Sequence, residues 1–121
     1  MSLYAWTQDV PIDADAYAQI LANMNYVKLP GCLVHLALEK PDGTLRYVDI
    51  WESEEACDAA FDKYIHPAVH PVLAERGIQV QGEPPRTELK VVDWSTATNS
   101  MRDAALQGRD AALQRRDAEL A

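Results

Sequence analysis

Three side chains suited to binding and orienting a ligand alternate along one predicted β-strand. Tyr47, Asp49 and Trp51 share one face of this strand, since successive side chains of a strand point to opposite sides. Val48 and Ile50 share the other face, and we expect this aliphatic pair to pack beneath the helices of the domain. The first three side chains would then face a cavity that a dimer encloses.

A histidine in the preceding predicted strand is assigned to the same cavity. His35 is out of phase with the aliphatic residues on either side of it. It is a candidate general base because imidazole titrates near neutral pH, and Asp49 is a candidate to orient it. Tyr47, Trp51 and Trp6 are candidates to bind an aromatic substrate by stacking. In the alternative interpretation, the histidine is a structural hydrogen-bonding residue and the aromatic rings fill the core.

Two further histidines stand four residues apart, in the sequence His-Pro-Ala-Val-His-Pro. On an unbroken helix this spacing places His66 and His70 on one face, as some metal-binding pairs require. Pro67 interrupts the pair, and no third ligand is near in sequence, so we predict no metal site. We expect His66 to cap a helix junction, and we include it among the candidate substrate-binding residues.

The hydrophobic periodicity predicts an α+β domain with elements in the order strand, helix, strand, strand, helix, strand. We expect strands at residues 3–10, 32–39, 44–52 and 87–94, a short edge strand at 78–81, and a first helix at 14–25. The second helix should begin after Ser53, break at His66-Pro67 and end at Gly77. Asp13 and Ser53 are the predicted N-caps.

This order is that of a ferredoxin-like βαββαβ sandwich, with both helices on one face of a four-stranded antiparallel sheet. The other face would carry apolar groups, so we expect a second copy to cover it and form a dimeric α/β barrel. We assign residues 1–97 to this domain and 98–121 to a C-terminal helical tail. Leucine recurs every seven residues in the tail without a second apolar seam. A helix that docks or bridges a higher oligomer and a frayed extension both remain open.

Composition narrows the possible partners and the compartment. The net charge of −8 at pH 7 argues against binding to nucleic acid or to anionic membranes. No run approaches 18 apolar residues and no signal-peptide pattern opens the chain, so we expect a cytoplasmic protein. Cys32 and Cys57 are expected to be free thiols. The chain has no Gly-rich phosphate loop and no nucleophile-elbow motif.

The exit of the third predicted strand, Tyr-Val-Asp-Ile-Trp-Glu-Ser-Glu-Glu-Ala, resembles the antibiotic biosynthesis monooxygenase-like family of the dimeric α/β barrel superfamily. Pro30-Gly31 before the second strand and the final Val-Val-Asp-Trp segment support the resemblance, which covers roughly residues 3–95. It implies the barrel fold and a cavity position for Trp51. Haem-degrading members use a strand asparagine and a helix histidine, where this sequence has Gln8 and Phe61.

Two functions are consistent with these patterns. The first is a cofactor-independent monooxygenase that acts on a small aromatic or polyketide-like compound, with His35 deprotonating a phenol and an apolar cavity holding the anion beside dioxygen. The second is a non-catalytic small-molecule-binding or assembly module. A ligand-sized void of roughly 300 Å³ or more would favour a site over a packed barrel.

Overall fold

The computed structural model describes residues 2–97, and the expected tail at 98–121 lies outside them. The described elements are β1 (Tyr4–Val10), α1 (Ala14–Asn23), β2 (Cys32–Glu39), β3 (Leu45–Trp51), α2 (Glu54–Ala60), the π-helical turn η1 (Phe61–Ile65), α3 (His66–Glu75) and β4 (Arg86–Leu89). Met1–Lys90 form one compact unit, to which all of these elements belong, and a second unit begins at Val91. No helix among the described residues is long and apolar enough to cross a membrane.

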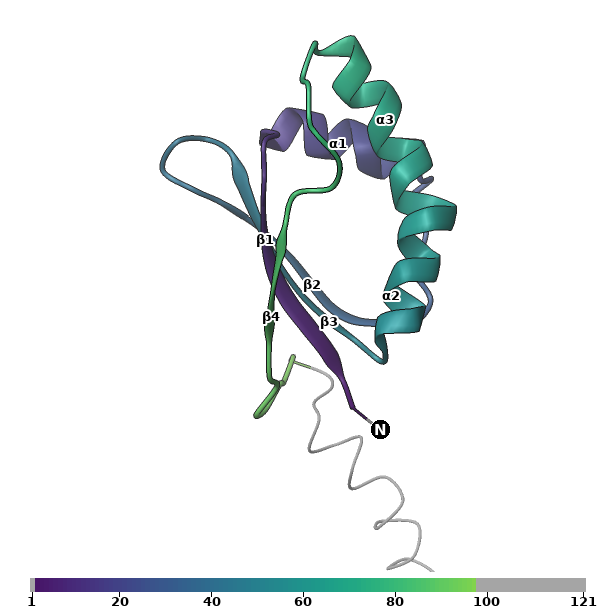
Figure 1. Cartoon of the computed structure of the whole chain (residues 1–121), viewed down its shortest axis with the longest axis vertical. Helices are drawn as coiled ribbons and strands as arrows, with labels where there is room; N and C mark the ends of the chain where they lie inside the picture. The colour runs from purple at the N-terminus through teal and green to yellow at the C-terminus, as the bar shows by residue number, and fades with distance from the viewer. Residues whose placement is uncertain (1, 98–121) are drawn as a thin grey trace, which may run out of the picture. The chain divides into compact units, whose positions relative to one another are not determined.

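The four strands form one antiparallel sheet in the order β2-β3-β1-β4. Figure 1 shows the helices together on one side of this sheet, with the β2–β3 hairpin extending beyond it. This is the predicted ferredoxin-like arrangement. The predicted caps are also confirmed: Asp13 Oδ1 accepts a hydrogen bond from Ala16 N at 2.8 Å, and Ser53 Oγ accepts one from Ala56 N at 3.1 Å.

The sheet faces are reversed relative to the sequence-based expectation. Trp6 and Trp51 are buried in a cluster with Cys57 and Phe61, so their face of the sheet lies beneath the chain's own helices. The aliphatic side chains lie on the opposite face, where Leu36 is 46% exposed. The reason is that large rings from β1, β3 and η1 pack beside Cys57 of α2, in the place that the aliphatic side chains were expected to occupy. The predicted dimer-enclosed cavity is therefore wrong in its location.

The register of the β2–β3 hairpin determines which way the histidine points. It is continuous from Glu39, opposite Leu45, to Val34, opposite Ile50, and places His35 opposite Asp49 on the face that the helices cover. A β-bulge between Cys32 and Val34 changes only the start of β2, where it brings Cys32 opposite Trp51.

The second helical segment is continuous and does not break at His66-Pro67 as predicted. The π-helical turn η1 joins α2 to α3, and His66 N–H donates to Phe61 O, five residues back. A wider turn directly before Pro67 relieves the clash that a proline ring makes with the preceding helical turn, which explains why the helix continues. The helix then ends as predicted near Gly77, whose φ is +67°.

Two strand predictions near the end of the unit are corrected. Residues 78–81 form no strand, because Ile78 packs into the core beside α3 and its N–H bonds Leu73 O at 2.9 Å. The last strand was expected at 87–94, but β4 covers only Arg86–Leu89, the four residues that pair with β1. The preceding segment is held by a side chain instead, since Gln8 Nε2 donates to Pro84 O at 2.7 Å.

Candidate functional site

A chain of hydrogen bonds links four side chains from α1, β2 and β3. Tyr17 Oη lies 2.7 Å from His35 Nε2, and His35 Nδ1 lies 2.7 Å from Asp49 Oδ1. The second carboxylate oxygen of Asp49 accepts a hydrogen bond from Trp51 Nε1–H at 3.0 Å. The structure thus brings together the predicted pair, His35 and Asp49, and adds a tyrosine that the sequence analysis did not assign to the site.

Asp49 is the fixed centre of this chain because it is buried in the sheet. Its side chain is 2% exposed, whereas that of His35 is 33% exposed. A buried carboxylate is stable only when hydrogen bonds and charges satisfy it, and here both oxygens have a donor. An ionised Asp49 requires a proton on His35 Nδ1, and in the neutral form of the ring Nε2 then accepts from Tyr17.

Tyr17 lies over His35 from the neighbouring helix. Their rings are stacked, with centroids 6.0 Å apart, and the ring of Tyr47 meets both edge-on at 5.8 Å and 5.2 Å. Burial, followed by the negative charge of Asp49, raises the pKa of Tyr17 above its ordinary value. Burial, followed by Tyr17 and Asp49, likewise raises the pKa of Tyr47. Both hydroxyls therefore hold their protons at neutral pH.

Helical periodicity places Tyr17 on the core-facing side of α1, but it does not by itself assign Tyr17 to the site. Tyr17 belongs to the apolar face of α1 with Ile20 and Met24, and all three pack in one cluster. Helical spacing identifies the buried face but not which strand residue it meets. A tyrosine is amphipathic, with an apolar ring and a polar hydroxyl, so a hydroxyl on a core-facing helix indicates a polar partner beneath it.

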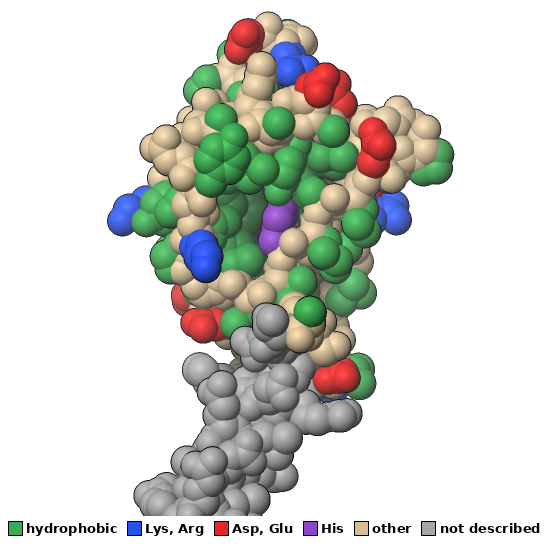
Figure 2. Space-filling model, turned by 180° about the vertical axis from the view of Figure 1, so that it is seen from behind, with side chains coloured by type: hydrophobic (Ala, Val, Ile, Leu, Met, Phe, Trp, Pro, Cys, Tyr) green, Lys and Arg blue, Asp and Glu red, His purple; other side chains and the backbone are tan. Residues whose placement is uncertain are grey.

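A cavity of about 770 Å³ lies between the sheet and the helices and reaches this chain of hydrogen bonds. Its wall is mostly apolar, and the polar side chains in it include Gln8, Tyr17, His35, Tyr47, Asp49 and His66. Figure 2 shows the cavity from behind as a hollow surrounded by hydrophobic side chains, with histidine visible inside it. Apolar walls with a few polar groups are typical of small-molecule sites, and the volume exceeds the roughly 300 Å³ that a ligand requires.

The two predicted tryptophans lie behind this wall and contribute no surface to it. Trp51 is fully buried and its role in the site is to donate to Asp49. Trp6 is 1% exposed and packs edge-on against Phe61, with ring centroids 5.8 Å apart. Of the predicted aromatic substrate contacts, Tyr47 is the one placed on the cavity wall.

The histidines of α3 reach the wall of the cavity away from Asp49. His66 and His70 are stacked, with ring centroids 5.8 Å apart, and both line the cavity. Carboxylates flank His66, with Asp62 Oδ1 at 3.5 Å and Glu83 Oε1 at 3.7 Å. Within residues 2–97, no three His, Cys, Asp or Glu side chains are grouped closely enough to hold a metal ion.

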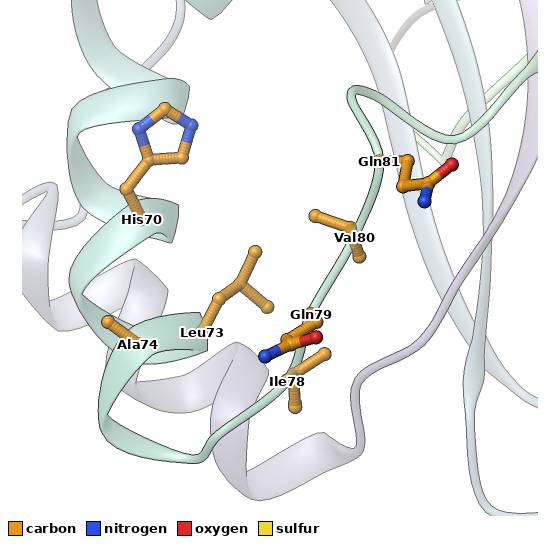
Figure 3. A pocket seen from close by; sticks show the side chains of 7 residues that line it. All are labelled: His70, Leu73, Ala74, Ile78, Gln79, Val80 and Gln81. Carbon is orange, nitrogen blue, oxygen red and sulfur yellow. The ribbon is translucent and has the colours of Figure 1, made fainter.

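A second depression, of about 570 Å³, lies between the end of α3 and residues 78–81. Figure 3 shows His70, Leu73 and Val80 around it, with the segment running beside the helix. His70 is the one ionisable side chain among its lining residues. It therefore lacks the pair of histidine and carboxylate that lines the larger cavity.

Comparison with known proteins supports the fold. No family model matches the chain, and no curated protein matches it. A protein from Chloroflexus aurantiacus, provisionally named as an antibiotic biosynthesis monooxygenase, is 22% identical, with 78% of this chain and 98% of that one covered and a TM-score of 0.52. A similarly named protein from Caulobacter crescentus is 17% identical, with 75% and 91% covered and a TM-score of 0.51.

A protein of unknown function from Nitrosomonas europaea has the same fold. It is 17% identical, with 81% of this chain and 96% of that one covered and a TM-score of 0.54. At such low identities the likeness concerns the path of the backbone and does not extend to the site residues. The chain therefore shares the ferredoxin-like fold of solved structures that are provisionally named as antibiotic biosynthesis monooxygenases.

Proposed function

We propose that the chain is a cofactor-independent monooxygenase that acts on a small aromatic or polyketide-like phenol within its own cavity. One observation carries the proposal: a histidine anchored by a buried carboxylate lies on the wall of a mostly apolar cavity of about 770 Å³. The fold shared with structures provisionally named as antibiotic biosynthesis monooxygenases supports the same class of reaction.

The chemistry begins with removal of a proton from the phenol. Asp49 holds His35 in one tautomer and stabilises the imidazolium that forms, which makes the histidine an oriented base. The resulting anion is rich in electrons, and the apolar wall keeps water away from it. Tyr47 supplies a ring edge for orientation.

The oxidant is dioxygen, and the substrate supplies the electrons. The phenol is the enol form of a ring ketone, so its anion shares its charge with the carbon that is a methylene in the ketone form. The anion gives one electron to dioxygen, the two radicals combine at that carbon, and the peroxide formed takes a proton from the imidazolium to give a hydroperoxide. Loss of water then leaves a carbonyl group, so that a methylene and dioxygen become a carbonyl and water. No external reductant is needed, which is why the proposal invokes no cofactor.

Substitution of the base tests the proposal. In His35→Gln, we expect oxygen uptake with a hydroxyanthrone as substrate to fall about 10²–10³-fold, the usual contribution of a general base. The same compound should still raise the melting temperature of the variant, because the cavity wall is unchanged. Asp49→Asn should also be impaired, since its amide N–H would face a donor, either His35 Nδ1–H or Trp51 Nε1–H.

The matched control is Asp9→Asn, which removes a carboxylate from β1 where it pairs with Arg46 at 2.7 Å. Its oxygen uptake should equal that of the parent. The proposal fails if no phenolic compound shifts the melting temperature of the parent protein. Binding without oxygen uptake would instead assign the chain to the non-catalytic binding modules.

A further inference from the structure

The donors and acceptors around His35 leave neither ring nitrogen free for a substrate. Nδ1 is bonded to Asp49 and Nε2 to Tyr17, each at 2.7 Å. When the ring of His35 is neutral with its proton on Nδ1, Tyr17 Oη donates its single proton to Nε2 and keeps lone pairs that can accept a further hydrogen bond. Tyr17 also lines the cavity. An acidic hydroxyl that enters the cavity therefore finds its acceptor on the tyrosine rather than on the histidine.

We propose that Tyr17 is a catalytic residue: its hydroxyl oxygen takes the proton of the substrate while its own proton passes to His35. The inference rests on the proposed function and names the atom that the substrate contacts. It also restricts the substrate to compounds with a weakly acidic hydroxyl, bound with that hydroxyl between α1 and β2. The aromatic ring of the substrate then extends toward the apolar wall of the cavity.

The proton balance of this step is complete without another reagent. Before transfer, the substrate O–H donates to Tyr17 Oη, and Tyr17 O–H donates to His35 Nε2. After transfer, His35 Nε2–H donates to Tyr17, and Tyr17 O–H donates to the substrate anion. One O–H bond breaks on the substrate and one N–H bond forms on His35. The tyrosine is neutral before and after the transfer. The new imidazolium lies against the Asp49 carboxylate.

The environment of Tyr17 favours passing the proton to His35 over forming a negatively charged tyrosinate. Its hydroxyl lies near the buried Asp49 carboxylate, so a tyrosinate would be repelled by an adjacent negative charge. Tyrosine by itself is therefore not the base. It conducts a proton only because His35 is placed to receive one, and the stacked arrangement of the two rings holds the contact in position.

Ionisation of a bound phenol tests the inference separately from oxygen chemistry. The probe is para-nitrophenol, whose anion is coloured, and the measurement is the ratio of bound anion to bound phenol at one pH. We expect the parent protein to raise this ratio at least about tenfold over water, which corresponds to one pKa unit. In Tyr17→Phe the ratio should return to its value in water, while the dissociation constant changes less than about threefold.

The control variant is Tyr26→Phe, which removes the hydroxyl of a tyrosine that is 71% exposed and outside the cavity wall. It should ionise the probe as the parent does. An unchanged ratio in Tyr17→Phe would overturn the inference while leaving the proposed function in place. Failure of the parent to bind the probe or any other phenol would instead remove the proposed function.

A crystal structure of the parent with the probe tests the same inference without a substitution that affects folding. The probe oxygen should lie within hydrogen-bond distance of Tyr17 Oη, with the contact between Tyr17 and His35 retained. A probe oxygen on His35 Nε2, with the tyrosine displaced, would show that the histidine takes the proton directly and would overturn the inference.

Discussion

At the scale of single residues, the buried carboxylate of Asp49 influences every weakly acidic group around it. Burial is the main cause of the raised pKa values of Tyr17, Tyr47, Cys32 and Cys57, and the negative charge of Asp49 adds to each of them. The pKa of the Cys32 thiol rises to about 12 and that of Cys57 to about 11. Burial, with the charge of Asp49 added, thus keeps these two hydroxyl and two thiol groups protonated at neutral pH.

This arrangement predicts a loss of stability in alkali. A group whose pKa is raised by folding contributes stability that is present below its unfolded pKa, here about 9, and lost as pH rises through the folded value. For Cys57 the shift of two units corresponds to roughly 3 kcal/mol of unfolding free energy lost between pH 9 and 11. Urea unfolding of the parent and of Cys57→Ala over this range measures it.

The cysteine variant should lose less stability than the parent as pH rises, because it has no thiol to ionise at this position. Tyr26→Phe, which changes an exposed group, should show the slope of the parent. Equal slopes for the parent and Cys57→Ala would show that burial of this thiol does not contribute to the pH dependence.

At the scale of elements, the sequence predicts which residues of a strand share a face better than it predicts which face the helices cover. Alternation correctly grouped Tyr47, Asp49 and Trp51, and the phase of His35 placed it with them. Alternation does not reveal which side of a sheet the helices cover, because aliphatic and aromatic side chains both pack in a core. The assignment was therefore reversed, and the cavity was expected between subunits instead of within one.

Two local features that build the site were not predictable from period or propensity. The bulge after Cys32 adds a residue to β2 and brings Cys32 to the cavity wall, without a glycine or proline inside the strand to mark it. The π-helical turn at Phe61–Ile65 occurs where a proline usually indicates the end of a helix. Both arise from tertiary packing: Cys32 packs against the cluster that contains Trp6 and Trp51, and the helix must follow the sheet past Pro67.

The approach of β2 to α2 predicts a sharp difference between two glycines. Gly31 has φ of +83°, and a Cβ added there would lie 2.7 Å from Ala56 Cβ. Gly43 has φ of +88°, but a Cβ there would meet nothing within 4 Å. Gly43→Ala should therefore cost about 1 kcal/mol through backbone strain alone, and Gly31→Ala should cost clearly more.

Urea unfolding of both glycine variants measures this difference. The matched positive φ makes Gly43→Ala the control for strain, so the excess cost in Gly31→Ala reports the close contact with α2. Equal losses in the two variants would show that the segment before β2 can move away from the helix at no cost.

At the scale of the whole molecule, the face of the sheet opposite the helices is the main unexplained surface of the first unit. Leu36 and Leu38 are 46% and 47% exposed on β2, and Val48 and Ile50 are half-buried beside them on β3. Exposed apolar patches of this kind are typical of interaction surfaces. The candidate site lies on the other face and is assembled within one chain, so its chemistry does not depend on what covers this one.

We propose that a second copy of the chain covers this face as a homodimer, because a twofold axis lets one self-complementary apolar surface bury itself. Leu36→Glu should then raise the dimer dissociation constant at least about tenfold, since a buried leucine contributes roughly 1.5–3 kcal/mol. Sedimentation at micromolar concentration measures it, and Tyr26→Glu, at an exposed position before β2, is the control that should remain dimeric.

A parent protein that sediments as a single chain at every concentration, or a Leu36→Glu variant that dimerises as tightly as the parent, would contradict the proposal. Ligand binding in the monomeric variant should persist, because Tyr17, His35 and Asp49 come from the same chain.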